Sequence, residues 1–169
     1  MIALRKIISG GQTGVDQGAL RAAQSLGFSC GGWCPPGRAC ESGIIPLHFP
    51  LQEMPEERSP NAPGIPRSLR TEWNVRDSDA TLILQPHARE RPDPGTAWTM
   101  QCATEFGRPL LVCDPCDVAA SGRILGWLTK CDVRTLNVAG PCEGTSPGIG
   151  EQTFTLLHGL LLQSRASSA

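Results

Sequence analysis

The sequence predicts a Rossmann-like α/β fold in which a mostly parallel central sheet carries helices on both faces. Three observations support this prediction. Short apolar runs alternate along the chain with longer segments whose apolar residues recur at helical spacing. Loops rich in glycine and proline separate these segments. The length of 169 residues suits one domain that buries its own core. Strands and helices that alternate in this way form three-layer parallel sheets.

Five short apolar runs predict the strands of this sheet. Each run lies between glycine, proline or polar segments, as strand ends require. The run at 80–84 contains only apolar residues and threonine, which is typical of a strand buried on both faces. The strands are expected at 4–8, 28–33, 80–84, 109–113 and 133–138.

Five further segments predict helices. Apolar and small residues recur at helical spacing in the first segment, which ends at Gly27, a residue suited to a C-terminal cap. Pro115 suits the first turn of the fourth helix, because its missing N–H would have no partner there. The helices are expected at 15–26, 67–76, 95–105, from 115 to about 128, and at 154–162.

Three loops are expected to lack regular structure. Prolines and glycines interrupt 34–43, prolines recur through the wandering connection at 46–66, and 85–94 is polar and proline-rich. Residues 1–163 are therefore expected to form a single ligand-binding domain. The tail at 164–169 is small and polar, so it is expected to be disordered.

The composition argues against several classes of protein. A formal net charge of -1 gives no positive field for nucleic-acid phosphates or anionic lipid. No apolar run approaches the roughly 20 residues of a membrane span, and glycines follow the first strand too soon for a signal peptide. We therefore expect a cytoplasmic protein with no nucleic-acid or membrane partner, whose 8 cysteines stay reduced.

Three loops that contain glycine are expected to meet at the carboxyl edge of the sheet. Gly10–Gly14 follows the first strand, Gly95 and Thr96 open the third helix, and Gly140–Ser146 follows the last strand. Amide N–H groups and the positive end of a helix dipole favour an anion at such points. The sequence therefore predicts a small oxyanion or phosphate-bearing ligand. Alternatively, the glycines only permit tight turns.

Arginine side chains near these loops are candidates to hold the anion. Arg38, Arg70 and Arg76 lie in neighbouring segments, and a guanidinium can donate two parallel hydrogen bonds to an oxyanion. Arginines on a surface helix are more often simply solvated. Arg76 could instead pair with Asp77 or Asp79 as part of the scaffold.

Standard nucleotide, metal and nucleophile motifs are missing from the sequence. The first loop is neither a GxGxxG fingerprint nor a P-loop with its lysine. Cys113 and Cys116 have the spacing of half a zinc site, but no second pair completes it. The histidines lie outside recognised nucleophile motifs. We expect no metal site made by protein side chains and no catalytic triad.

Five motifs together resemble the molybdenum carrier family. They follow the family's order across nearly the whole chain, so the resemblance is far more specific than one glycine loop. The motifs are SGGQTGVD at 9–16, GGWCPPGR at 31–38, RTEWNVRDSDATLIL at 70–84, NVAGP at 137–141 and PGI at 147–149. The resemblance implies a Rossmann-like fold related to lysine-decarboxylase-like and LOG proteins. It also implies binding of molybdenum cofactor or molybdate by a homo-oligomer, a dimer or tetramer, with molybdoenzymes as recipients.

The resemblance also implies which residues bind. It places the binding loops at 10–14, 33–38, 95–99 and 140–143, shaped by Asp16, Asn74 and Asp79. With the arginines included, the expected ligand-binding residues are Gly10, Gly11, Gln12, Thr13, Gly14, Trp33, Cys34, Arg38, Arg70, Asn74, Arg76, Gly95, Thr96, Thr99, Gly140, Pro141 and Glu143. No catalytic residue is expected.

The chain departs from the family's pattern at two places. Relatives carry a double glycine before the threonine, whereas this chain has Pro94, Gly95 and Thr96. Relatives often continue glycine and proline with arginine, whereas Cys142 follows Pro141 here. We therefore expect a basic contact of the family to be missing.

The leading hypothesis is a carrier or storage protein that binds its ligand without turning it over. One alternative is a nucleotide phosphoribohydrolase like the LOG proteins, whose catalytic glutamate closely follows the helix-opening threonine. Here Glu105 lies nine positions past Thr96, more than two helical turns away. Another alternative is a module that senses nucleotides with the same loops.

Overall fold

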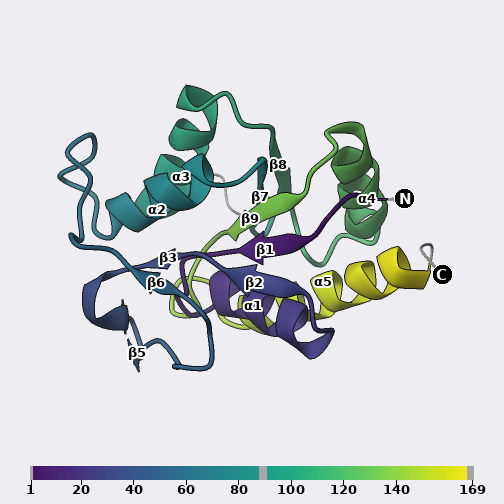
Figure 1. The fold of residues 1–169 in the computed structure, drawn as a ribbon, viewed down its shortest axis with the longest axis horizontal. Coiled ribbons are helices and arrows are strands. Elements are labelled where there is room, and N and C mark those ends of the chain that lie inside the picture. Colours follow the sequence, from purple (N-terminus) through teal and green to yellow (C-terminus); the bar gives the residue numbers. More distant parts are fainter. Residues whose placement is uncertain (1, 88–90, 167–169) are drawn as a thin grey trace.

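A parallel sheet forms the centre of the computed structural model, which describes residues 2–87 and 91–166 (Figure 1). The five strands lie side by side in the order β2-β1-β9-β7-β8, and every pairing is parallel. Their bounds are β1 Lys6–Ile8, β2 Ser29–Gly31, β7 Ala80–Leu84, β8 Leu110–Cys113 and β9 Thr135–Ala139. The predicted Rossmann-like fold class is therefore confirmed.

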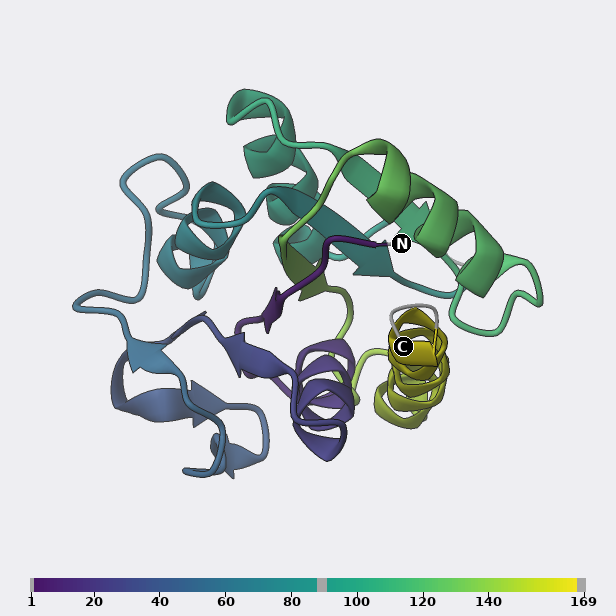
Figure 2. The same cartoon turned by 45° about the vertical axis from the view of Figure 1, so that its right-hand side comes forward.

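Helices cover both faces of the sheet. Their bounds are α1 Val15–Ser25, α2 Ser68–Arg76, α3 Pro94–Glu105, α4 Ala120–Lys130 and α5 Ile149–Ala166. Apolar residues of α1, α4 and α5 share one core with the strands, whereas α2 and α3 contribute to a separate cluster around Trp98 and Cys102. Figures 1 and 2 show α1 beside α5 and, apart from them, α2 beside α3.

Small residues determine how closely α1 and α5 approach. A Cβ atom on Gly18 would lie 2.4 Å from the carbonyl oxygen of Gly150, so only glycine allows this contact. Ala19, Ala22 and Ala23 are fully buried in the same helix. This close packing fixes the start of α1, and therefore the loop before it, relative to the start of α5.

Two of the three segments predicted to lack regular structure, 34–43 and 46–66, contain short elements, so that prediction was partly wrong. Within the third segment, 85–94, residues 88–90 lie outside the described part of the chain. β3 (Trp33–Cys34) pairs with β6 (Gln52–Glu53), β4 (Ala39–Cys40) pairs with β5 (Gly43–Ile44), and η1 (Pro36–Arg38) is a 3-10 turn. The Arg38 guanidinium organises this region by donating hydrogen bonds to four backbone carbonyls. It donates to the oxygens of Ile45, Pro46, Phe49 and Leu51.

Two helix boundaries were also predicted wrongly. α4 begins at Ala120 instead of Pro115, because Asp114 and Asp117 accept amide N–H groups in turns that precede the helix. α5 begins at Ile149 instead of Phe154, and it continues through 164–166, which were expected to be a disordered tail. Residues 167–169 of that tail lie outside the described part of the chain.

Several strand boundaries shift by about two residues. β1 begins at Lys6 instead of Leu4. β2 ends at Gly31 because Gly32 has a φ of 126°, which turns the chain away from the sheet. β9 begins at Thr135 instead of Val133.

Within the described residues, no helix has the length and hydropathy that crossing a bilayer requires.

Candidate functional site

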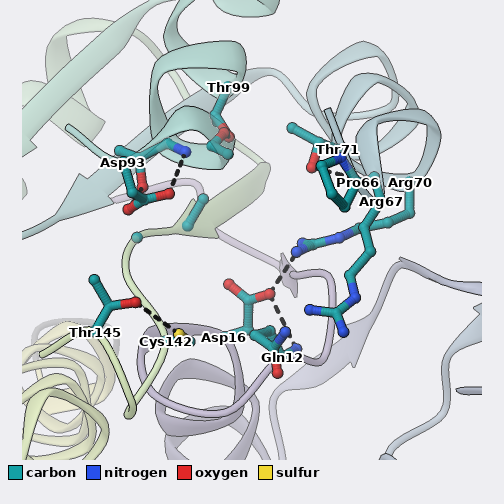
Figure 3. A pocket seen from close by; sticks show the side chains of 14 residues that line it. Gln12, Asp16, Pro66, Arg67, Arg70, Thr71, Asp93, Thr99, Cys142 and Thr145 are labelled. Carbon is teal, nitrogen blue, oxygen red and sulfur yellow. Dashed lines mark hydrogen bonds and ion pairs between the residues drawn. The ribbon is translucent and has the colours of Figure 1, made fainter. Parts of the chain in front are cut away.

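A cavity of about 150 Å³ opens at the carboxyl edge of the sheet, between the loops that follow β1, β7 and β9 (Figure 3). We call it the Asp16–Arg70 pocket. The chain leaves β1 through α1 toward β2, and it leaves β7 through α3 toward β8 on the other side and over the other face. This reversal is the point at which open α/β sheets bind ligands.

Three predicted loops and helix α2 contribute to the pocket. Of the residues expected to bind, the structure places Gln12, Arg70, Gly95, Thr96, Thr99 and Gly140 in its lining. The lining also contains Asp16, Pro66, Arg67, Thr71, Asp93, Ala139, Cys142 and Thr145.

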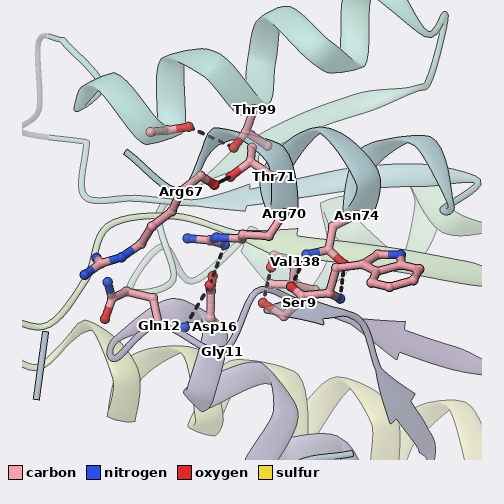
Figure 4. A network of polar contacts seen from close by, with 12 residues as sticks. Ser9, Gly11, Gln12, Asp16, Arg67, Arg70, Thr71, Asn74, Thr99 and Val138 are labelled. Atoms are coloured by element: carbon pink, nitrogen blue, oxygen red, sulfur yellow. Dashed lines mark hydrogen bonds and ion pairs between the residues drawn. The ribbon is translucent and has the colours of Figure 1, made fainter. Parts of the chain in front are cut away.

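A buried ion pair between Asp16 and Arg70 forms the floor of the pocket (Figure 4). Asp16 stands in the first turn of α1 and is 2% exposed. Its Oδ2 lies 3.0 Å from Nη1 of Arg70 and also accepts the Gln12 amide N–H at 3.2 Å. Burial raises the pKa of the Asp16 carboxyl, although Arg70 and the Gln12 amide act in the opposite direction. The buried Nε of Arg70 has no hydrogen-bond partner among the described residues.

The glycine loop after β1 provides a place for the Arg70 side chain. A Cβ atom on Gly10 would lie 1.7 Å from Nη1 of Arg70, so the guanidinium lies directly against this glycine. Gly11 and Gly14 have φ angles of 80° and 79°, which other residues rarely adopt. Replacing Gly10 therefore displaces Arg70, whereas replacing Gly11 or Gly14 strains the turn itself.

Two amides of this loop already donate hydrogen bonds within the protein. The Gln12 N–H donates to Asp16, and the Thr13 N–H donates to Oε1 of Gln12 at 3.0 Å. The loop was expected to present these amides to a ligand. The anion that the Gln12 amide contacts in the structure is instead the carboxyl group of Asp16.

Arg67 adds a second guanidinium to the pocket. It precedes α2 in a left-handed conformation with a φ of 59°, and Figure 4 shows its side chain extended toward Gln12. Within the described residues, Arg67 takes part in no ion pair. Sequence reasoning missed this residue, although its position as the first residue of the helix predicted at 67–76 could have indicated it.

The start of α3 forms the opposite wall. The Asp93 carboxylate caps this helix by accepting the Thr96 N–H at 3.0 Å and the Thr96 hydroxyl at 2.8 Å. Thr99 is buried, and its hydroxyl donates to the Gly95 carbonyl at 3.0 Å. Sequence reasoning missed Asp93, although aspartate before a proline and a glycine is a recognisable cap. Glu105 is exposed at the end of α3 and does not line the pocket.

The loop after β9 forms the third wall and is tied to the β4–β5 hairpin. Cys142 Sγ lies 3.0 Å from the Thr145 hydroxyl. Outside the pocket, the Glu41 carboxylate accepts a short hydrogen bond from the Thr13 hydroxyl and another from the Gly144 N–H at 2.9 Å. The Thr13 hydrogen bond is the main reason that the pKa of Glu41 is lowered. Glu41 therefore links the loop after β1 to the loop after β9 through hydrogen bonds.

Three expected binding residues line a neighbouring groove beside Glu41. Thr13, Gly14 and Glu143 belong to this groove. The carboxylate of Glu143 accepts the N–H groups of Gly148 and Gly150 and so caps α5. Pro141 is buried, and its carbonyl accepts the Val15 N–H at 3.3 Å. These residues fix the helix starts and do not line the pocket.

The expected residues around Trp33 lie apart from the pocket. The Trp33 indole N–H donates to Asp77 at 2.8 Å, and the ring lines a separate cavity. Asn74 joins α2 to this segment, because its side chain accepts the Trp33 N–H and donates to the Trp33 carbonyl. Arg76 pairs with Asp77 at 2.6 Å, which is the alternative that the sequence left open.

The remaining expected residues have positions within the scaffold. Cys34 is fully buried, and Arg38 holds the carbonyls described above. Gly10 lies against Arg70, and a Cβ atom on Gly11 would meet Leu51 and Ile45. Asp79 accepts the amides of Arg134 and Thr135 and thereby fixes the start of β9.

The described residues contain no group of three or more histidine, cysteine, aspartate or glutamate side chains that could hold a metal ion. The charged groups of the lining that can donate to a ligand are instead the guanidiniums of Arg67 and Arg70. Guanidinium donors fit an oxyanion or a phosphate group.

Comparisons with known proteins agree with the fold. A sequence model of the Circularly permutated YpsA SLOG family matches residues 7–161. A crystal structure from Syntrophus aciditrophicus SB, named "Putative molybdenum carrier protein", is 38% identical and has a TM-score of 0.83. The match covers 95% of this chain and 96% of that one. Comparison with curated proteins gives no match.

Proposed function

Because the chain belongs to the Circularly permutated YpsA SLOG family, we propose that it is a carrier or storage protein that holds molybdenum cofactor or molybdate in the Asp16–Arg70 pocket. The name of the Syntrophus protein supports the carrier role and the molybdenum. The ligand is bound by the residues of the pocket and is released without chemical change.

One observation carries the proposal: two guanidiniums converge on a small cavity at the point where the order of the strands in the sheet reverses. Arg70 is held against Gly10 by the loop after β1, and Arg67 extends over the same space. A guanidinium matches the oxygens of phosphate or molybdate through parallel N–H groups. A cavity of about 150 Å³ suits one such group, with the remainder of a larger ligand outside.

Thermal unfolding with defined ligands tests the proposal. Molybdenum cofactor or molybdate should raise Tm more than AMP or NAD does at equal concentration. A ligand that binds only the folded state adds about 2.7 kcal/mol at a hundredfold excess over its Kd. Arg67→Met should abolish the shift, whereas Arg123→Met on α4 should retain it. A larger shift with the nucleotides, and no molybdenum by mass spectrometry after growth on molybdate, would refute the proposal.

A second candidate function, hydrolysis of a nucleotide, is favoured by one observation. The buried carboxyl of Asp16 lies in the pocket and has a raised pKa, as general acids in enzymes often do. The sequence argument against catalysis considered only a glutamate on α3. Release of ribose 5-phosphate from nucleoside monophosphates, lost in Asp16→Asn, would favour this candidate over the carrier.

Assembly and transfer are further parts of the carrier proposal. We expect a dimer or tetramer that delivers its ligand to molybdoenzymes in the cytoplasm. Sedimentation analysis of the purified protein measures the first expectation. Activation of an apo-molybdoenzyme by the loaded carrier measures the second.

A further inference from the structure

We propose that Asp16 makes the pocket select oxyanions that carry a proton, such as hydrogenphosphate and hydrogenarsenate, over fully deprotonated ones, such as molybdate and sulfate. This inference rests on the proposed function, because it concerns the same pocket. It implies that the pocket discriminates against free molybdate.

The Asp16 carboxyl presents one of its two oxygens to the space where a ligand would lie. Its Oδ2 is occupied by Arg70 and by the Gln12 amide. Figure 3 shows the other oxygen directed into the open space of the pocket, toward the side where Cys142 and Thr145 lie. An anion that reaches the Arg70 guanidinium from this space therefore comes to lie beside a carboxyl oxygen. An ionised carboxylate can only accept hydrogen bonds.

Two hydroxyl groups of the pocket can accept hydrogen bonds from a ligand but cannot donate to it. Thr71 donates its hydroxyl hydrogen to the Arg67 carbonyl at 3.4 Å, and Thr99 donates to the Gly95 carbonyl at 3.0 Å. Because each hydroxyl has one hydrogen, both oxygens are left as acceptors toward the ligand. The pocket therefore offers acceptors as well as the guanidinium donors, and a ligand with an O–H group satisfies both kinds.

The positive and negative side chains that line the pocket oppose one another. Arg67 and Arg70 are opposed by the carboxylates of Asp16 and Asp93, so the pocket is not strongly positive. Repulsion between a bound anion and Asp16 acts in a buried region, where water screens it weakly. A proton placed between the two oxygens converts this repulsion into a charge-assisted hydrogen bond. Hydrogenphosphate supplies that proton near neutral pH, whereas molybdate and sulfate have none.

Asp93 cannot make the same selection. Both of its oxygens accept hydrogen bonds from Thr96, so the carboxylate is turned toward the helix that it caps. Cys142 is the remaining titratable group of the lining, and its Sγ contacts the Thr145 hydroxyl. Asp16 is therefore the group that distinguishes the two classes of oxyanion.

The test compares four oxyanions on the full chain at pH 7.5. Calorimetric titration measures Kd for phosphate and arsenate, which carry a proton, and for sulfate and molybdate, which do not. The wild-type protein should bind the first pair at least tenfold more tightly. Asp16→Asn replaces an acceptor by an amide that can donate, so it should reduce the ratio to about one. Asp132→Asn makes the same chemical change at an exposed residue outside the pocket and should retain the ratio.

The outcomes separate this inference from the proposed function. Molybdate or sulfate binding as tightly as phosphate would overturn the selectivity and leave the carrier function standing. An Asp16→Asn protein that folds and keeps the wild-type ratio would also overturn it. Absence of binding by all four anions, together with no binding of the cofactor, would overturn both. If Asp16→Asn does not fold, the wild-type ratio alone decides.

Discussion

Replacing Arg70 by methionine should destabilise the protein far more than replacing Arg67, although both guanidiniums line one pocket. Arg70→Met leaves the carboxyl of Asp16, which is 2% exposed, without its partner. Breaking a buried ion pair in this way costs about 3–5 kcal/mol. For a chain of this length the loss corresponds to a fall in Tm of roughly 6–20 °C. Arg67→Met breaks no ion pair among the described residues, so its effect should stay within about 0.5 kcal/mol.

The pH dependence of this loss identifies Asp16 as its cause. The pKa of Asp16 is raised in the folded protein, so its folded state holds the proton more tightly than its unfolded state. Stability from this group is therefore present below the unfolded value of 3.8 and is lost as the pH rises through the folded pKa. Removing Arg70 raises that pKa further, so the deficit of Arg70→Met should be largest at neutral pH and shrink in acid.

Urea denaturation at several pH values, for both single variants and for Arg70→Met combined with Asp16→Asn, measures these effects. The double variant should recover much of the loss, because neither charge remains buried. Equal stability of Arg70→Met and Arg67→Met at pH 7.5 would refute the reasoning. So would a double variant no more stable than Arg70→Met.

Four further predictions concern single positions. Gly10→Ala should fold but lose most oxyanion affinity in calorimetric titration. The added Cβ would lie 1.7 Å from Nη1 of Arg70, so the guanidinium must move away. Gly122→Ala, on α4 with no atom within 4 Å of the added Cβ, should instead stabilise by about 0.5–1 kcal/mol in urea. The pKa of Glu41 is lowered, so the Tm advantage of wild type over Glu41→Gln should exist above pH 4.5 and vanish as the pH falls through the folded pKa. In thiol titration of the native protein, exposed Cys116 should react first, and buried Cys102, with a pKa of about 12, should react last.

The elements with strong local signals were predicted well. The strand at 80–84 has the predicted bounds, since a continuous apolar run between polar residues leaves little choice of register. α1 begins at Val15, as the glycine loop before it indicated. The short strands β3 to β6 could not be predicted, because two-residue pairings leave no periodic pattern in the sequence. Their positions depend on the hydrogen bonds that Arg38 donates to carbonyls later in the chain. Periodicity also could not show that α5 starts at Ile149, since its cap comes from Glu143.

The pocket was predicted less completely than the fold. Convergence of the three glycine loops follows from parallel strands, and Gln12, Gly95 and Gly140 indeed line one cavity. Arg67 and Asp93 were missed because neither belongs to a glycine loop. The orientation of Trp33, Arg38 and other expected residues depends on tertiary contacts that no spacing reveals.

The glycine loop after β1 makes contacts within the protein that its sequence does not indicate. Glycines at the start of a helix commonly allow a ligand to approach backbone amides. In this chain Gly10 allows Arg70 to approach the backbone, and the Gln12 amide contacts Asp16. The ligand would therefore meet a preformed ion pair and not bare amides. Amides donate equally to every oxyanion, whereas the Asp16 carboxylate would favour an oxyanion that brings its own proton. Under the proposed function, the strength of binding and the choice of ligand would therefore depend on the same two side chains, Asp16 and Arg70.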